Sequence, residues 1–292
     1  MFHLRRKLWH LKELSKFWRY IELFERNSAG DAYPIYSRLC TACHILDKGL
    51  HIRNFEPGHG GAVYKRAKLL ESQIPADSRI RGEAAFQWCL NVMVDYEAAQ
   101  QTGAPSYPAG GYAVNAEQTA AFENLCSAEV SCRDFLPDEV SDDVWEEIVG
   151  LAMTAPNSCC RQSTRFHIVG DPEKVSKLSG TIAGATGFNR LIPYLVFVAA
   201  DLRVYASCDH RLPYIDAALA LDRFTLAACT RGVYLTILNF EHADKREREL
   251  VHSMLGIPRS QRIVVAAAAG RPANLPSKPG RMAVEHFLEI HK

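Results

Sequence analysis

The segment Tyr194-Leu-Val-Phe-Val-Ala-Ala200 decides the fold class of this chain. It is a short, uninterrupted apolar run, which is typical of a strand buried on both faces of a sheet. Two more such runs occur in the second half of the chain, at Phe166–Val169 and Arg262–Ala269. They alternate with segments of helical composition at Tyr214–Arg231 and Lys245–Leu255. Because strands and helices alternate here, the sequence predicts an α+β or α/β core in the second half.

The chain before this core is dominated by helix-forming residues. Predicted helices span Tyr36–Leu50, Ala62–Gln73, Gly82–Gln101, Asn115–Cys126 and Asp142–Thr154. Residues 102–111 are the best linker candidate, because six of these ten residues are Gly, Pro or Ser. We therefore expect an all-helical N-terminal domain over residues 1–111 and an α+β domain over residues 112–292, both of ordinary domain size.

Composition and charge narrow the class of protein. Hydrophobic residues make up 48% of the 292 residues and charged residues 23%, which is typical of a globular protein. No stretch approaches the ~20 consecutive apolar residues of a membrane-spanning helix, and the formal net charge of +1 argues against a nucleic-acid binder held by bulk charge. Nine cysteines without a disulfide-scaffold spacing, and no recognisable secretory signal, predict reduced thiols in the cytoplasm.

Charge is unevenly distributed along the chain. Residues 1–20 carry a net charge of +5, so the rest sums to −4. In residues 1–24 the apolar side chains lie close to one helical stripe, with Lys and Arg largely on the other side. Two interpretations remain open: a helix that packs on the body of the protein or on a partner subunit, and a helix that lies peripherally on an anionic membrane surface.

The motif Cys40-Thr-Ala-Cys43-His44 matches the pattern of covalent haem attachment. The residues around it continue an amphipathic helix, and attachment takes place in an exporting compartment for which no signal is visible. We therefore interpret the match as a coincidence inside a helix. A zinc site would need a second ligand pair at standard spacing, which the chain lacks, so no metal site is predicted.

Two further local features have ordinary explanations. Pro57-Gly-His-Gly-Gly61 lacks the preceding strand and the glycine spacing of a dinucleotide-binding loop, so a structural turn is predicted. The adjacent Cys159 and Cys160 have no base nearby in the sequence, and we expect a buried pair of small apolar side chains.

Basic residues recur at the ends of predicted elements in the second half: Arg133, Arg161, Arg165, Lys278 and Arg281. A phosphorylated cofactor requires cations and backbone donors around its phosphate. Basic segments that converge on one site would supply them. The alternative is that each side chain caps a helix or solvates a loop.

Residues from about Ser127 to His286 resemble the nitroreductase family of FMN-dependent oxidoreductases. The resemblance rests on segments in the same order as in the family: Ser131-Cys-Arg-Asp-Phe135, Ala155-Pro-Asn-Ser-Cys-Cys-Arg-Gln-Ser-Thr-Arg-Phe166, Tyr214-Ile-Asp-Ala-Ala-Leu-Ala220 through Gly232, Leu255-Gly-Ile-Pro258, and Gly270-Arg-Pro272 followed by Lys278 and Arg281. It implies a mixed sheet flanked by helices, and a homodimer with FMN at the subunit interface.

The resemblance also implies a reaction: NADH or NADPH reduces the flavin, which then passes the electrons to an acceptor such as a nitro compound or a quinone. An arginine near the flavin would stabilise the reduced, negatively charged ring. No side-chain acid or base is assigned, because hydride moves directly between stacked rings. The cofactor-binding residues carried over are Ser131 and Arg133 against the flavin, Ser158 and Gln162 along its ring and ribityl chain, and Lys278 and Arg281 at its phosphate.

This chain departs from the family pattern at three positions. Glu129 stands where the family has its first phosphate-binding Arg, Cys160 where it has Asn, and Thr164 where it has Trp. These changes weaken the expected grip on the phosphate. They favour a second hypothesis, a non-catalytic nitroreductase-like scaffold. The segments His44–Leu50 and Pro57–Gly60 resemble a helical extension on nitroreductase-like proteins linked to bacterial surface-polysaccharide genes, so this scaffold would be an accessory to polysaccharide biosynthesis at the membrane surface.

Overall fold

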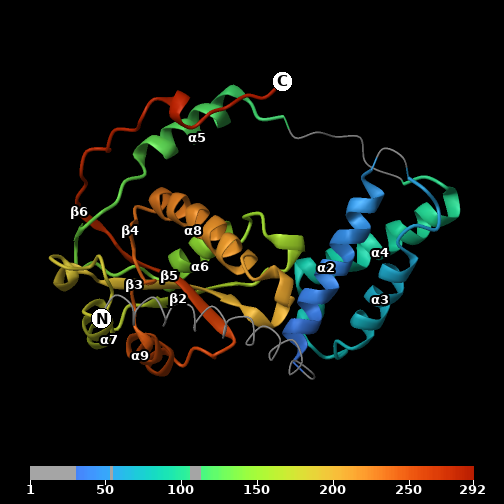
Figure 1. The fold of residues 1–292 in the computed structure, drawn as a ribbon, viewed down its shortest axis with the longest axis horizontal. Helices are drawn as coiled ribbons and strands as arrows, with labels where there is room; N and C mark the ends of the chain where they lie inside the picture. Colours follow the sequence, from blue (N-terminus) through green and yellow to red (C-terminus); the bar gives the residue numbers. More distant parts are fainter. Residues whose placement is uncertain (1–30, 53–54, 106–112) are drawn as a thin grey trace, which may run out of the picture.

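The computed structural model describes residues 31–52, 55–105 and 113–292 (Figure 1). The predicted amphipathic segment 1–24 lies outside these residues, as does most of the predicted linker. The helices are α2 (Ala32–Leu50), α3 (Gly61–Ser72), α4 (Ala84–Thr102), α5 (Ala116–Ala128), α6 (Asp142–Ala152), α7 (Pro172–Ser179), α8 (Leu212–Thr230) and α9 (Lys245–Leu255). The strands are β1 (Asp134–Phe135), β2 (Thr164–Val169), β3 (Tyr194–Asp201), β4 (Tyr234–Leu238), β5 (Gln261–Gly270) and β6 (Pro272–Asn274).

Four strands form the central sheet in the order β2-β3-β5-β4. Each pair of neighbours in this sheet is antiparallel. The short strands β1 and β6 form a separate antiparallel pair. The predicted α+β class is therefore confirmed, and the strand pairs that the structure describes are antiparallel where the resemblance implies a mixed sheet.

Side chains of β3 alternate between the two faces of the sheet, as the pleat requires. Leu195, Phe197 and Ala199 pack in a core with α7 and α9, whereas Val196 and Val198 pack in a second core with α6 and α8. Helices therefore cover both faces, which explains why the strand reads as a continuous apolar run.

The helices α2, α3 and α4 have an apolar core of their own. It contains Leu39, Leu46, Leu70, Phe86 and other buried side chains from these three helices. Cys160 joins it as a partly buried side chain from the second half of the chain. The helical character predicted for this region is thus confirmed, while the boundary between residues 111 and 112 stays a prediction.

We call α5 together with residues 273–292 the arm. None of the residues of α5 is buried, and residues 273–292 are all exposed. Figure 1 shows these two segments side by side, running over α8 at a distance from the sheet. Lys278 joins them, because its Nζ donates a hydrogen bond to the carbonyl oxygen of Cys126.

Most predicted elements lie within a few residues of the observed ones. The helix expected at Tyr36–Leu50 begins earlier, at Ala32, because the Asp31 carboxylate accepts a hydrogen bond from the Tyr33 backbone N–H and caps the first turn. The strands β1, β4 and β6 and the helix α7 had no counterpart in the prediction. None of the described helices is long and apolar enough to span a bilayer.

Candidate functional site

The segment from Asn157 to Gln162 has an unusual backbone conformation. Cys159, Cys160 and Gln162 have φ angles of 51°, 57° and 53°. L-residues other than Gly, Asn and Asp rarely occupy this left-handed region, because Cβ approaches the following carbonyl oxygen. Each such residue carries strain, and strained backbone persists only where the surrounding structure holds it in place. This turn also contains the predicted site residues Ser158 and Gln162.

A buried carboxylate holds the start of the turn. Asp216 on α8 is 1% exposed, and its Oδ1 accepts hydrogen bonds from the backbone N–H of Ser158 at 2.8 Å and from the Ser158 hydroxyl at 2.7 Å. Its Oδ2 accepts a hydrogen bond from the Tyr205 hydroxyl at 2.6 Å. Because the carboxylate is satisfied on both oxygens, it fixes Ser158 in one position.

Three further interactions hold the end of the turn. The Gln162 backbone N–H donates to Asn157 Oδ1 at 2.9 Å, which closes the turn on itself. Arg161 forms an ion pair with Asp209 at 2.8 Å, and its Nε donates to the Val204 carbonyl at 3.1 Å. The turn is therefore fastened both to α8 and to the 202–209 segment.

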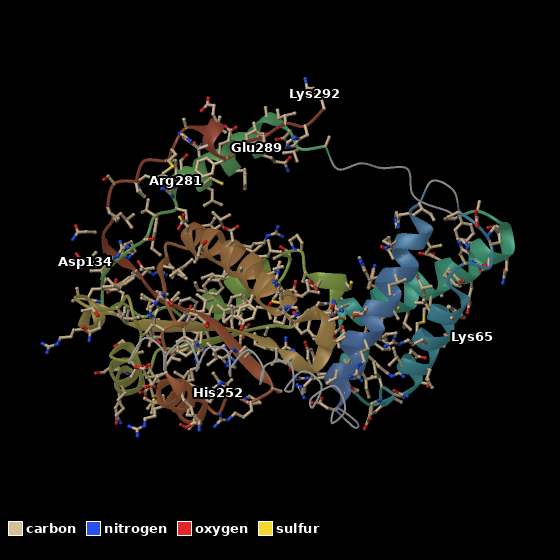
Figure 2. All side chains as sticks on the ribbon, viewed as in Figure 1. Lys65, Asp134, His252, Arg281, Glu289 and Lys292 are labelled. Atoms are coloured by element: carbon tan, nitrogen blue, oxygen red, sulfur yellow. The ribbon has the colours of Figure 1, made fainter. Side chains whose placement is uncertain are left out.

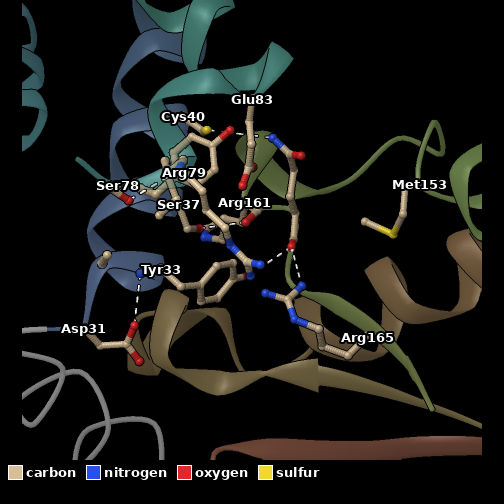
Figure 3. Close-up of a pocket in the computed structure, with 14 residues that line it drawn as sticks. Asp31, Tyr33, Ser37, Cys40, Ser78, Arg79, Glu83, Met153, Arg161 and Arg165 are labelled. Atoms are coloured by element: carbon tan, nitrogen blue, oxygen red, sulfur yellow. Dashed lines mark hydrogen bonds between the residues drawn. The ribbon is translucent and has the colours of Figure 1, made fainter. Parts of the chain in front are cut away.

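The N-terminal helices contribute to the same turn (Figure 3). The Tyr33 hydroxyl of α2 donates to the Gln162 carbonyl at 2.9 Å, and the Ser37 hydroxyl donates to the Arg161 carbonyl at 2.7 Å. Burial raises the pKa of Tyr33 to about 12, so it stays a hydrogen-bond donor over the physiological range. Thus α2 is part of the scaffold that holds the candidate site.

The two cysteines of the turn differ from the expected buried pair. Cys159 is exposed, and Cys160 is partly exposed and packs against the core of the N-terminal helices. Burial raises the pKa of Cys160 to about 11. The Gln162 side-chain amide lies 3.6 Å from Cys160 Sγ and 3.8 Å from Cys40 Sγ. Cys160 is therefore a neutral thiol, and a poor nucleophile, at neutral pH.

The haem motif has no exposed attachment point. Cys40 and Cys43 are 1% and 0% exposed, and both pack in the core of the N-terminal helices. Among the described residues, no group of three or more His, Cys, Asp or Glu side chains is arranged to hold a metal ion.

The other predicted site residues lie elsewhere in the chain. Ser131 and Arg133 are exposed and flank the start of β1, and Lys278 and Arg281 are exposed on the arm. The Arg281 guanidinium donates to the carbonyls of Pro279 and Gly280 at 3.1 Å and 3.3 Å. Among the described residues these three cations have no ion pair.

The six predicted residues therefore form two groups within one chain. Figure 2 shows Asp134, which follows Arg133, and Arg281 on the side of the molecule opposite to Lys65 of the N-terminal helices. Ser158 and Gln162 lie in the turn that contacts α2. One group carries exposed cations and the other carries the strained turn.

Sequence reasoning missed the residues that hold the turn. Asp216 is one of two acidic residues in the Ala/Leu-rich helix α8 and lies on its apolar face, and a charge on an apolar helix face was the available signal. Tyr33 and Ser37 gave no such signal, because their contacts to residues 161 and 162 exist only through the packing of α2 on the turn.

Comparisons with known proteins agree with this architecture. Residues 129–189 match the model of the nitroreductase family. Similar solved structures include a nitroreductase family protein from Streptococcus pneumoniae, 16% identical, which covers 58% of this chain and 100% of that chain with a TM-score of 0.50. An FMN-dependent nitroreductase from Clostridium difficile is 18% identical and covers 57% and 98%, with a TM-score of 0.50. A nitroreductase from B. subtilis is 22% identical and covers 58% and 74%, with a TM-score of 0.50. No curated protein matches the chain.

These similarities define the α+β part of the molecule as a domain with the nitroreductase fold. The matched residues 129–189 include β1, the strained turn and β2. The α+β part of the chain thus has the nitroreductase fold, with residues 129–189 matching the family model, and a region of helices precedes it.

Proposed function

We propose that this protein is an FMN-dependent oxidoreductase that passes electrons from NADH or NADPH to an acceptor such as a nitro compound or a quinone. The observation that carries the proposal is the turn 157–162, a strained segment inside the family match and held by Asp216, Asn157 and Tyr33. Strain maintained in this way is characteristic of ligand sites. The C. difficile relative is an FMN-dependent nitroreductase, which supports the same cofactor here.

The chain's own residues fit a phosphorylated flavin. Arg133, Lys278 and Arg281 are exposed cations without an ion pair among the described residues, so their charge is available for a phosphate. Ser158 and Gln162 would line the ring and ribityl chain. Hydride acceptance from a nicotinamide and electron delivery to the acceptor would be the chemistry of bound FMN. Glu129 opposes phosphate binding, because its carboxylate stands where the family has a cation.

We propose that the active form is a homodimer. Arg281 lies on the side of the molecule opposite to the N-terminal helices, whereas the strained turn contacts α2 of those helices, so a complete site would take residues from two copies. The arm supports this arrangement, because a large share of its apolar side chains has no cover from the residues that the structure describes. These exposed residues are Phe122, Leu275, Met282, Val284, Phe287, Leu288 and Ile290.

Location forms part of the same proposal. All nine cysteines are free, which supports a reducing compartment such as the cytoplasm. Peripheral contact with a membrane or a partner through residues 1–24 remains a hypothesis, since this segment lies outside the described residues.

The test is spectroscopic. We expect the purified protein to be yellow, the released flavin to be FMN, and anaerobic NADH or NADPH to bleach the flavin absorption near 450 nm. Comparison of the two nucleotides at equal concentration identifies the donor. A colourless protein that added FMN cannot saturate contradicts the proposal.

One observation favours a second candidate, a non-catalytic scaffold. Glu129 is partly buried close to β1, where it opposes phosphate binding, and Cys160 replaces the Asn of the family. Flavin that binds but is not reduced by either nucleotide supports this candidate, which would then serve polysaccharide biosynthesis as an accessory protein. Reversion of Glu129 to Arg separates the candidates further, since it should tighten FMN binding if a phosphate lies there.

A further inference from the structure

A cavity of about 590 Å³ lies where the N-terminal helices meet the strained turn. Its wall is formed by the start of α2, by residues 78–83 and by the segment 161–165 (Figure 3). The volume is in the usual range for sites that bind small molecules. Part of this wall comes from the helical region and part from the segment 155–166 carried over from the family, because Gln162 also lines the cavity.

Three arginines and two carboxylates line the cavity: Arg79, Arg161, Arg165, Asp31 and Glu83. Arg161 is paired from outside the cavity with Asp209 at 2.8 Å, and Asp31 shares Arg203 with Asp201.

Three charged groups on the wall remain without a counter-ion. Arg165 donates to the carbonyls of Gln162 and Thr164 at 3.1 Å and 2.8 Å, and forms no ion pair with a described residue. Arg79 is exposed and has no ion pair or hydrogen bond with the described residues. Glu83 also lines the cavity without an ion pair to any described residue. Two uncompensated guanidinium groups thus face one carboxylate.

A buried hydroxyl of the same wall has no partner. Tyr36 is 8% exposed, it lines the cavity, and its Oη has no hydrogen-bond partner in the part of the chain that the structure describes. Burial is the largest cause of its raised pKa, followed by the neighbouring Cys40 and Glu83, and the Glu83 carboxylate adds to the shift as a weak acceptor outside hydrogen-bond geometry. The group is therefore a neutral donor, and a buried donor is stable only when it finds an acceptor. A ligand oxygen would supply one.

The rest of the wall is less polar. Ala32, Ile80 and Met153 lie on it, and the Tyr33 ring is covered by the Arg165 guanidinium at 4.1 Å. Side chains of this kind accommodate the body of an organic molecule, whereas the cations and the free hydroxyl fix its polar end.

We propose that this cavity binds a small organic anion, with an apolar body and one carboxylate or phosphate group held by Arg79 and Arg165, and with an oxygen that accepts a hydrogen bond from Tyr36. Glu83 disfavours negative charge beside Tyr36, so the anionic group lies toward the two arginines. The cavity shares Gln162 with the proposed flavin site, but Arg79 and Tyr36 belong to the helical region, so variants at these two residues test the anion site apart from the redox function.

The experiment is isothermal titration calorimetry on the full chain with three probes of similar size: benzoate, phenyl phosphate and benzyl alcohol. We expect one of the two anions to bind at least tenfold more tightly than the neutral alcohol, and the better anion identifies the head group. Equal affinity for charged and neutral probes, or no binding of either anion, overturns the proposal.

Three variants sharpen the result. R79Q should weaken the anion at least tenfold, whereas R66Q, a matched change of an exposed arginine on α3, should leave the affinity unchanged. Y36F removes a buried hydroxyl that has no partner, so it should keep or raise the thermal unfolding midpoint while it weakens the anion several-fold. If R79Q and R66Q bind alike, or if Y36F lowers the midpoint without an effect on affinity, the assignment is wrong. Loss of FMN binding in a parallel titration would sink the redox proposal and leave these measurements intact.

Discussion

The central sheet and the arm differ in how far their apolar side chains are covered from solvent. Residues 195–200 of β3 are all 0% exposed, because α6 and α8 cover one face and α7 and α9 the other. On the arm, Phe287 is 72% exposed and Ile290 is 69% exposed. A single chain rarely exposes so many large apolar side chains together unless a partner covers them. The sheet core is therefore covered within one chain, whereas the described residues leave the apolar side chains of the arm exposed, as the proposed dimer requires.

The sequence patterns of the two regions do not reveal this difference. The helix α5 begins with a capping box in which Asn115 Oδ1 accepts from the Gln118 N–H at 2.8 Å, so its local signals are as good as those of the buried helix α8. What separates them is tertiary packing. The comparison teaches that helix formation and burial are independent properties here, and each can be tested by itself.

The largest expected effect is the loss of an aromatic side chain from the sheet core. Phe224 of α8 is 0% exposed and stacks on Phe166 at 4.8 Å and on Trp145 at 6.3 Å between ring centroids. The substitution F224A should lower the free energy of unfolding by about 3–5 kcal/mol, measured by urea denaturation. The matched change F122A on the arm should lower it by less than about 0.5 kcal/mol under conditions that keep the protein monomeric. Similar losses for both variants would abolish the distinction between the two regions.

A smaller loss in the free energy of unfolding is expected where Asp216 of α8 holds the strained turn. D216N keeps the volume of the side chain but replaces one acceptor oxygen with a donor, which must face either Ser158 or the Tyr205 hydroxyl. We expect a loss of about 1–3 kcal/mol in the free energy of unfolding, together with weaker FMN binding. D222N, on the exposed face of the same helix, is the control. Unchanged stability in D216N would show that the turn does not depend on this carboxylate.

An element could be predicted where a local sequence pattern defines it, and could not where contacts between residues distant in sequence define it. The strand 194–200 was predicted because burial on both faces leaves a continuous apolar run, which is a local signal. The strand β4 was missed because Tyr234–Leu238 is short and follows Gly232 directly, so it resembled a helix end. The left-handed turn could not be predicted, because its conformation depends on Asp216 and Tyr33, which are distant in sequence.

The same reasoning applies to the predicted site. The resemblance to the nitroreductase family pointed to Ser158 and Gln162, which lie inside the turn that the structure distinguishes by its strain. It gave no indication that Arg281 lies on the side of the chain opposite to the N-terminal helices, because spacing along a sequence carries no information on distance in space. Whether the six residues bind FMN stays a prediction.

The arm gives the third prediction, which concerns assembly. F287D places a carboxylate on the exposed apolar surface of the arm, so it should weaken the proposed dimer at least tenfold, a change of about 1.4 kcal/mol. The free energy of unfolding of the monomer should not change. Light scattering after gel filtration at micromolar concentration measures the mass, with E289Q as a control for an exposed neighbour. A wild-type protein that is monomeric at every concentration contradicts the role given to the arm.

The smallest expected effect is a pH dependence of the free energy of unfolding, caused by two partly buried histidines near the central sheet. Burial lowers the pKa values of His167 and His252 from the ordinary 6.5, although His167 Nε2 donates to Gln261 Oε1 at 2.8 Å. Below about pH 6.5 the unfolded chain then binds protons that the folded chain does not, so the free energy of unfolding falls as the pH falls. The slope is at most about 1.4 kcal/mol per pH unit for each histidine. H167Q should reduce the fall in the free energy of unfolding between pH 6.5 and 5.5, measured by urea denaturation. The double variant H167Q/H252Q should reduce this fall further. If the double variant keeps the full slope, the acid sensitivity arises outside these two buried rings, and the pH dependence does not distinguish the body from the arm.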